Sequence, residues 1–269
     1  MADARARGRD AFGGARLSTL QQRALAAGAV AGAVVLWWLV CALGLIDKVL
    51  LPPPGEVVTA LVRALLDGSL AGHVGISLLR VLEGFLLALI LAVPIGILMG
   101  SSQIAHGTID PLVELVRPIP PIAMIPLAIL WFGIGEVSKV FIIAYGAFFP
   151  ILINTMAGFR DVDRVHIRAA QTLGAGRREI FRDVILRSAF PHIVTGARLG
   201  MGMAFIVLVA AELIASSAGL GYLINDARYS FRTDQMLMGM ACIGVLGFGL
   251  NKLLLGAERV LLRWKYVND

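Results

Sequence analysis

The chain has 269 residues, of which 58% are hydrophobic and only 16% are charged, and its formal net charge is +6. A soluble domain covers its core with polar surface and usually carries about 25% charged residues, so this composition excludes an ordinary soluble domain and indicates lipid-facing helices. The positive charge does not indicate nucleic-acid binding, because the basic residues cluster in short segments between apolar runs, as they do in the cytoplasmic loops of membrane proteins.

The first apolar run covers residues 24–46 and follows an arginine-rich arm, residues 1–23. A helix needs about 20 apolar residues to cross about 30 Å of hydrocarbon, so we predict that this run is the first transmembrane span. The run is too long for a signal-peptide core and lacks a small-residue cleavage site, so we expect it to be retained. Cys41 and Cys242 follow no metal-ligand or disulfide pattern, and we interpret both as small core residues.

The second predicted span covers residues 76–100 and carries small residues at every fourth position, namely Gly84, Ala88, Ala92, Gly96 and Gly100. A stripe of small residues at this spacing lies on one helix face and lets a neighbouring helix approach closely. Pro94 lies within this span and predicts a kink.

The third predicted span begins near Thr108 and is irregular. Four prolines lie within nine positions, namely Pro118, Pro120, Pro121 and Pro126. Such a run cannot form a regular helix without freeing backbone carbonyls, which a membrane tolerates only where protein or a water-filled cavity covers them. One interpretation is a gate near a substrate path, formed with Met124 and Trp131, and the other is a packing irregularity that bends the span.

Three further spans are predicted at residues 140–159, 198–215 and 235–255, and a hydrophilic loop with seven arginines, residues 160–187, precedes the fifth. We assign residues 72–256, this loop included, to one transmembrane domain and residues 257–269 to a basic tail. Six spans place both termini on one side of the membrane. The arm, the loop and the tail then all lie in the cytoplasm, as the positive-inside rule expects.

The segment HIRAAQTLGAGRREIFRDVIL within this loop is typical of two short helices joined by a glycine turn. Gly174 lies where a C-terminal cap belongs, and Gly176 lets the chain enter the second helix. Ala169, Ala170 and Leu173 share one face of the first helix and could enter the groove of a partner. The alternative is an ordinary basic loop that only sets the topology. Because the chain has no GxxxxGK[ST] phosphate-binding loop, a drive by ATP would require a separate ATPase subunit.

This segment resembles the EAA loop of bacterial ABC importer permeases, which forms their coupling helix. The runs LPPPGEVVTAL, RPIPPIAMIPLAILWFGIGE, AAELIA and GLGYLI are similar to those of the nitrate/sulfonate/taurine branch, and IRAAQTLGA with IDPLVELVRP looks most like its taurine transporter permeases. Arg168 stands where the family has glutamate, and Arg187 where many relatives have proline. Carried onto this chain, the positions for coupling to the ATPase are Arg168, Ala169, Ala170, Leu173, Gly174 and Arg177.

The resemblance implies an all-α, six-span permease of the type-I ABC importer fold, with cytoplasmic coupling helices, in a bacterial inner membrane. It further implies a homodimeric pore in lipid, two ATP-binding subunits and a periplasmic solute-binding protein. ATP and Mg would bind to the partner ATPase, so that this chain itself has no cofactor, no metal and no catalytic residues. The implied cargo is a small anionic or zwitterionic solute, with taurine or another alkanesulfonate first and nitrate, bicarbonate or another small organic solute as the alternative.

Several charged residues could form parts of a substrate path. Glu212 lies deep in an apolar run, where a charge must be paired or hydrated, so it either lines the path with Pro120, Pro121, Met124 and Trp131 or fixes helix packing. Arg80 and Arg198 could meet a sulfonate or could extend to the membrane interface. We expect a local ion pair between Glu114 and Arg117. The histidines His73, His106, His166 and His192 have no metal-ligand spacing.

Two other classes of membrane protein are alternatives to a permease driven by ATP. An ion-coupled secondary transporter would normally have paired inverted repeats and several intramembrane charges, and the spans show no clear internal repeat. A membrane-embedded enzyme would need clustered His, Asp or Glu in its spans, and the predicted spans contain no such cluster.

Overall fold

The computed structural model describes residues 19–261, and every regular element within this range is helical. The chain divides into two compact units, residues 1–59 and 60–269, which are described separately. In chain order the helices are α1 (Thr19–Ala42), α2 (Pro54–Leu66), α3 (Ser69–Ser101), α4 (Gln103–Val116), the 3-10 turn η1 (Pro121–Met124), α5 (Ile125–Phe132), α6 (Glu136–Arg160), α7 (Arg164–Thr172), α8 (Arg177–Glu179), the π-helical turn η2 (Ile180–Ile185), α9 (Leu186–Ala215), α10 (Leu220–Tyr229) and α11 (Thr233–Leu261).

The first unit is organised around α1, which occupies most of the first predicted span. The chain folds back after this helix, and the Trp37 indole donates a hydrogen bond to the Pro52 carbonyl at 3.1 Å. The Cys41 thiol lies 3.4 Å from the Leu51 carbonyl and is buried, in agreement with its interpretation as a small core residue. Residues 1–18 of the predicted arm and 262–269 of the predicted tail lie outside the described residues.

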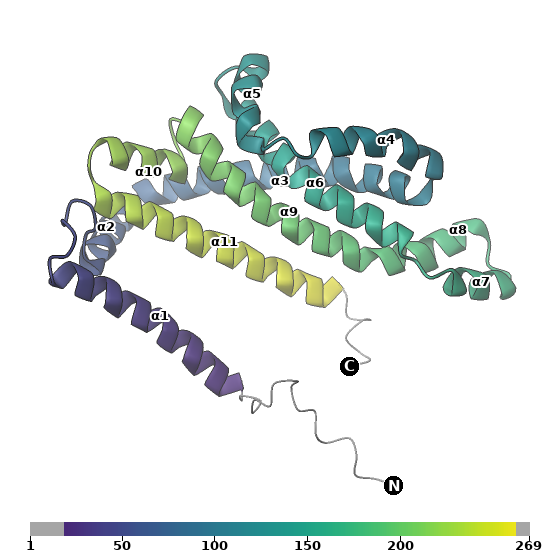
Figure 1. The fold of residues 1–269 in the computed structure, drawn as a ribbon, viewed down its shortest axis with the longest axis horizontal. Helices are drawn as coiled ribbons and strands as arrows, with labels where there is room; N and C mark the ends of the chain where they lie inside the picture. The colour runs from purple at the N-terminus through teal and green to yellow at the C-terminus, as the bar shows by residue number, and fades with distance from the viewer. Residues whose placement is uncertain (1–18, 262–269) are drawn as a thin grey trace, which may run out of the picture. The chain divides into compact units, whose positions relative to one another are not determined.

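The second unit is organised around α6, which packs between α3 and α9 (Figure 1). The predicted stripe on α3 faces α6. A Cβ atom at Gly84 would lie 2.5 Å from Ile143 Cγ2, and one at Gly96 would lie 2.7 Å from Thr155 Cβ. Ala88 and Ala92, between these glycines, are fully buried. The stripe therefore allows the close helix approach that the sequence predicts.

The opposite face of α6 packs as closely against α9, and here small residues on both helices contribute. Gly146 of α6 lies under Val207 of α9. Gly200 of α9 in turn lies against Ile151 and the Ala147 carbonyl of α6. The three helices enclose a core of fully buried aliphatic side chains, which positions their ends rigidly relative to one another.

Four helical segments in the described residues are long and apolar enough to cross a membrane, namely Ser69–Ser101, Glu136–Arg160, Arg177–Ile214 and Thr233–Val260. The third predicted span is a pair of helices, Gln103–Val116 and Pro121–Phe132, bent by 85°. The first predicted span contains a shorter apolar helix, Ala27–Ala42. The prediction that the proline cluster interrupts a regular helix is confirmed.

Two boundaries differ from those expected. The second helix of the hydrophilic loop continues through η2 into α9, so the fifth span begins before the predicted Arg198 and Pro191 lies inside it. The polar segment before the sixth span contains a helix, α10, whose side chains Leu220, Ile224 and Ala227 are buried. Its apolar face supplies the packing energy, and the charges on its other face hid this pattern in the sequence.

Candidate functional site

The predicted coupling segment lies at the end of the second unit opposite α10 (Figure 1). The side chain of Asp163 caps the start of α7 by accepting a hydrogen bond from the Val165 amide at 2.8 Å. At the other end, the Gly174 amide donates to the Gln171 carbonyl and the Ala175 amide to the Ala170 carbonyl, both at 3.0 Å. These two bonds form a Schellman motif, which requires a left-handed residue, and Gly174 has a φ of 84°.

The helix entry that follows is also defined by local hydrogen bonds. The Gly176 amide donates to the Glu179 carboxylate at 2.8 Å, so that this side chain caps the start of the helical segment leading into α9. The tight turn of residues 173–176 therefore sets the direction of both helices, as the glycine spacing predicts.

The residues predicted to couple to an ATPase lie together around this turn and are accessible. Leu173 is 88% exposed. Arg168, Ala169, Gly174 and Arg177 are exposed, and Ala170 is half-buried. Leu173 is the C-cap of α7, and its amide donates to the Ala169 carbonyl at 3.1 Å. An exposed leucine beside small residues and arginines is suited to docking with another protein.

At the opposite end of the bundle, Glu212 is buried in a network of polar side chains. Its carboxylate accepts hydrogen bonds from Ser77 Oγ at 2.8 and 2.9 Å, from Arg80 Nη1 at 2.7 Å and from the Gly221 amide at 2.8 Å. The side chain has no exposed surface and Arg80 is 3% exposed. Glu212 is thus fully paired inside the protomer, and this geometry supports the packing role rather than a position on a path.

Arg80 joins this carboxylate to a second one. Its Nε and Nη2 atoms donate to the two oxygens of Glu136 at 2.6 and 2.7 Å, a bidentate pair. The ammonium of Lys139 lies 2.9 Å from Glu136 Oε1. Arg80, Lys139 and Glu212 are buried, and Glu136, whose side chain is 60% exposed, supplies the second negative charge, so that two cations and two anions balance one another. We call Ser77, Arg80, Glu136, Lys139 and Glu212 the polar knot.

The polar knot also determines the path of the chain between α9 and α10. Arg80 Nη1 donates to the Ala218 carbonyl at 2.6 Å, and the Leu220 amide donates to Ser77 Oγ at 2.9 Å. The Gly219 amide donates to His73 Nδ1 at 3.1 Å, and a Cβ atom at Gly219 would collide with the Glu212 carboxylate. Four separate helices, α3, α6, α9 and α10, are thereby joined at one end.

The sequence singled out Arg80 and Glu212 as unusual charges but did not pair them. They lie 132 positions apart, and Arg80 was considered as a sulfonate ligand. Ser77, Glu136 and Lys139 were missed, because each is unremarkable near the end of an apolar helix. The second candidate for meeting a sulfonate, Arg198, lies 3.4 Å from Glu258.

The candidate gate residues lie at the bend between α4 and α5. Pro120 precedes η1 in an extended conformation, Pro121 and Met124 are its first and last residues, and Ile125 then starts α5. The Tyr145 hydroxyl lies 3.0 Å from the Val116 carbonyl and 3.2 Å from the Ile119 carbonyl. It thus covers backbone acceptors that the helix break leaves free.

Trp131 lies at the far end of α5 and forms an aromatic cluster with Phe132 and Phe141. Its ring centroid is 6.3 Å from that of Phe132 and 6.1 Å from that of Phe141, with the rings edge to face. More than half of its side-chain surface is exposed. Trp131 thus contacts aromatic side chains, whereas Glu212 has its partners within the polar knot.

The predicted pair of Glu114 and Arg117 was wrong. No ion pair joins them in the part of the chain that the structure describes, where Glu114 lies in the last turn of α4 and Arg117 forms its C-cap. Both side chains instead line a cavity of about 280 Å³ between α4 and α6.

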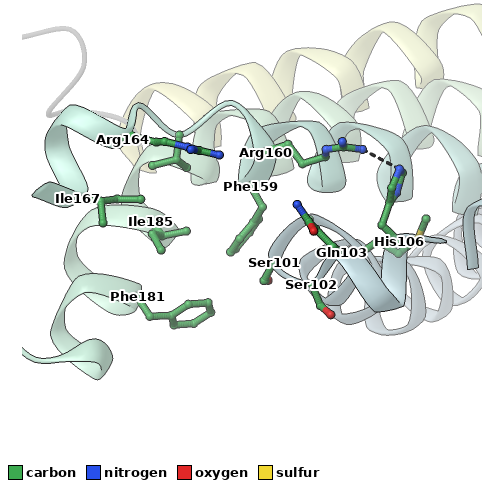
Figure 2. A pocket seen from close by; sticks show the side chains of 13 residues that line it. Ser101, Ser102, Gln103, His106, Phe159, Arg160, Arg164, Ile167, Phe181 and Ile185 are labelled. Carbon is green, nitrogen blue, oxygen red and sulfur yellow. Dashed lines mark hydrogen bonds between the residues drawn. The ribbon is translucent and has the colours of Figure 1, made fainter. Parts of the chain in front are cut away.

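A larger cavity of about 470 Å³ lies behind the coupling segment. Its walls are the turn between α3 and α4, the end of α6, the start of α7 and η2 (Figure 2). Arg160 Nη1 lies 2.8 Å from His106 Nε2 at its edge, as the dashed line in Figure 2 marks. The sequence did not indicate this cavity, since its walls come from four segments that no local pattern connects.

Comparison with known proteins gives consistent matches over most of the chain. Residues 92–264 match the family model described as "Binding-protein-dependent transport system inner membrane component". The chain is 40% identical to the taurine transport system permease protein TauC of Escherichia coli, over 91% of this chain and 90% of TauC. It is also 40% identical to the putative aliphatic sulfonates transport permease protein SsuC of Bacillus subtilis, over 86% and 84% of the two chains.

The fold is similar to that of a solved transporter, reported as inward-facing conformations of the MetNI methionine ABC transporter. The TM-score is 0.57 at 20% sequence identity, and the match covers 70% of this chain and 91% of the other. Members of the family are permease subunits of ABC importers, which work with separate ATP-binding subunits and a substrate-binding protein. The apolar spans and these matches lead to one conclusion: the chain belongs to the binding-protein-dependent inner-membrane permeases, as a multi-pass, non-catalytic subunit of an ABC importer.

Proposed function

We propose that this permease imports taurine or another small alkanesulfonate, as a homodimer with two ATP-binding subunits in the bacterial inner membrane. The observation that carries this proposal is the 40% identity to a taurine permease over nine tenths of both chains. The similar identity to an aliphatic sulfonate permease supports the wider class of sulfonates. Nitrate, bicarbonate or another small organic solute is the alternative cargo.

In this proposal the coupling segment faces the cytoplasm and docks into the ATPase. Leu173 enters a groove of the partner, and the small side chains at Ala169 and Ala170 let the backbone approach it. Arg168 and Arg177 flank this contact and supply polar interactions. Both chain termini lie on the same side, because the arginine-rich loop and arm follow the positive-inside rule.

ATP and Mg²⁺ bind to the partner ATPase, and this chain contributes movement. Closing of the ATPase dimer pushes α7, and the rigid α3–α6–α9 bundle follows as one body because its helices are closely packed. The bend at Pro120, Pro121 and Met124, with Trp131 at the end of α5, is the part of the path that opens and closes. Glu212 contributes to the rigidity of the bundle and does not contact the solute.

The test is uptake of labelled taurine by cells that lack their own taurine permease and express this chain with the ATPase and binding protein encoded beside it. ATP-dependent uptake that excess alkanesulfonate inhibits and excess nitrate does not is the expected result. Uptake of labelled nitrate in place of taurine by the same complex would overturn the sulfonate assignment and support the alternative cargo.

A further inference from the structure

The 470 Å³ cavity behind the coupling segment has a cationic lining. Arg160 and Arg164 both line it, and its lining includes no aspartate or glutamate. Arg164 forms no hydrogen bond or ion pair within residues 19–261, and Arg160 bonds there only to His106. Asp110 lies 3.7 Å from this histidine but outside the cavity lining. Two guanidinium groups therefore share a recess without a counter-ion, a condition that favours an anion.

The lining of the cavity also contains neutral hydrogen-bonding groups. Ser102 is the N-cap of the 14-residue helix α4, and its neighbour Gln103 also lines the cavity. The Ser102 hydroxyl accepts a hydrogen bond from the Ala105 amide at 3.3 Å. The amides before Ala105 have no partner within the helix and add a partial positive charge, which assists anion binding beside the two arginines. Figure 2 shows Arg160, His106 and Gln103 grouped on one side of the recess.

Much of the remaining lining is apolar. Phe159 is buried, and its ring centroid lies 6.0 Å from that of Phe181. The π-helical turn η2 supplies Phe181 and Ile185 to the lining, and such turns often occur at functional sites. A recess of this size that is lined by two arginines and by aromatic and aliphatic side chains is suited to a small amphiphilic anion, with a sulfonate, carboxylate or phosphate head and a short alkyl part.

The position of the cavity connects it to coupling. Arg164 and Ile167, one turn apart on α7, face it, whereas Val165 and Arg168 are exposed elsewhere on the helix. A ligand here touches α7 on one side and the ends of α3 and α6 on the other. If α7 moves relative to the bundle during the ATP cycle, the ligand binds only the state in which both walls are in place, and it shifts the population toward that state.

We propose that this cavity binds a small amphiphilic anion, which holds α7 against the bundle and slows the ATPase cycle. The anion can come from the cytoplasm, as an alkanesulfonate, or from the headgroup of an anionic phospholipid. The effect on the ATPase cycle through α7, and the step of equating the cytoplasmic anion with the imported solute, rest on the proposed function, whereas anion binding in the cavity does not.

The experiment uses the purified permease–ATPase complex, without binding protein, in nanodiscs of phosphatidylcholine alone or with added phosphatidylglycerol. Propane-1-sulfonate is titrated by calorimetry, and the ATPase rate is measured alongside. The variant is Arg164→Gln, which removes an exposed charge that has no partner in the described residues. The matched control is Arg178→Gln, which removes an exposed arginine outside the cavity lining.

Loss of one charge-assisted contact should weaken propane-1-sulfonate binding about tenfold in Arg164→Gln and leave it unchanged in Arg178→Gln. Bound sulfonate should lower the ATPase rate of the wild type and not that of Arg164→Gln. If phosphatidylglycerol weakens sulfonate binding to the wild type but not to Arg164→Gln, the lipid headgroup is the natural occupant. Equal binding to the wild type and Arg164→Gln in both lipids would overturn the site, and binding without any change in ATPase rate would overturn its effect on the cycle.

This experiment is independent of cargo. A complex that fails to import taurine but binds propane-1-sulfonate through Arg164 would refute the proposed cargo and keep the cavity site. The reverse result would refute the cavity site alone.

Discussion

Arg80 is central to the buried ion pairs that stabilise this membrane protein. It lies in an apolar helix and is buried, yet each of its three nitrogen atoms donates to a carboxylate. Glu212 depends on it in the same way, since the other donors to its carboxylate are neutral. Removal of one member leaves an uncompensated buried charge, which costs about 3–5 kcal/mol.

We expect Glu212→Gln to lower the thermal unfolding temperature of the purified complex, because Arg80 loses one of its two anionic partners. Reduced uptake should follow from the loss of folded protein. The matched control is Asp226→Asn, which breaks the exposed pair with Arg232 at 2.9 Å and should cost no more than about 1 kcal/mol. An unchanged unfolding temperature combined with altered uptake kinetics would instead place Glu212 on the substrate path.

At the scale of the element, the three central helices depend on small residues at their contacts. The α3 contact to α6 leaves no room for a methyl group at Gly84, where Val140 and Ile143 are in the way. A Cβ atom at Gly75 of the same helix would meet nothing within 4 Å. The two glycines therefore allow close packing to be separated from helix propensity.

We expect Gly84→Ala to destabilise the protein by about 1–3 kcal/mol, since the helices must separate or Ile143 must shift. Gly75→Ala should cause no loss and can gain up to about 1 kcal/mol from helix propensity. Thermal unfolding of the two variants under identical conditions measures the difference. Equal unfolding temperatures would show that α3 and α6 are not packed as closely as described.

The turn after α7 is the second element whose geometry allows a sharp test. We expect Gly174→Val to abolish stimulation of the ATPase by loaded binding protein, because a β-branched residue is strained at a φ of 84° and the Schellman motif opens. Membrane insertion should survive. Gly176→Ala is the control, since Gly176 has a φ of −71° and space for a methyl group. Normal stimulation in Gly174→Val would contradict the coupling role.

At the scale of the whole molecule, the second unit leaves much apolar surface uncovered. In the most apolar 18-residue stretch of α11, only 11% of the residues are buried. The side chains of Val245, Phe248 and Leu253 on this helix are exposed. Lipid or a second copy of the chain can cover such residues. Trp131 and Leu130, at the end of α5, are exposed in the same way.

We therefore expect the complex to contain two copies of this chain and two ATPase subunits. Native mass spectrometry of the complex released from detergent gives the stoichiometry directly, and differently tagged copies expressed together should co-purify. A complex with one permease chain would exclude the homodimer and would leave lipid as the only cover for the exposed helices.

The sequence by itself determined the features that depend on neighbouring residues. The membrane class follows from long uncharged runs, the break of the third span from four prolines within nine positions, and the turn after α7 from Gly174 at a cap position. These features result from backbone sterics and the transfer of apolar surface, which act within a few helical turns. They were sufficient to predict a membrane protein built of helices and the two helices joined by the turn at Gly174.

Only the tertiary structure decided which distant groups meet. It joined Arg80 to Glu212 across 132 positions, assigned α10 to the core and formed the cationic cavity from four segments. A hydropathy pattern states that a helix face is buried but not which face of which helix covers it. From the sequence, a charge in an apolar run is equally compatible with a pore residue and with a structural ion pair. Close packing of the helices decides between them, because it places the partner of the charge beside it.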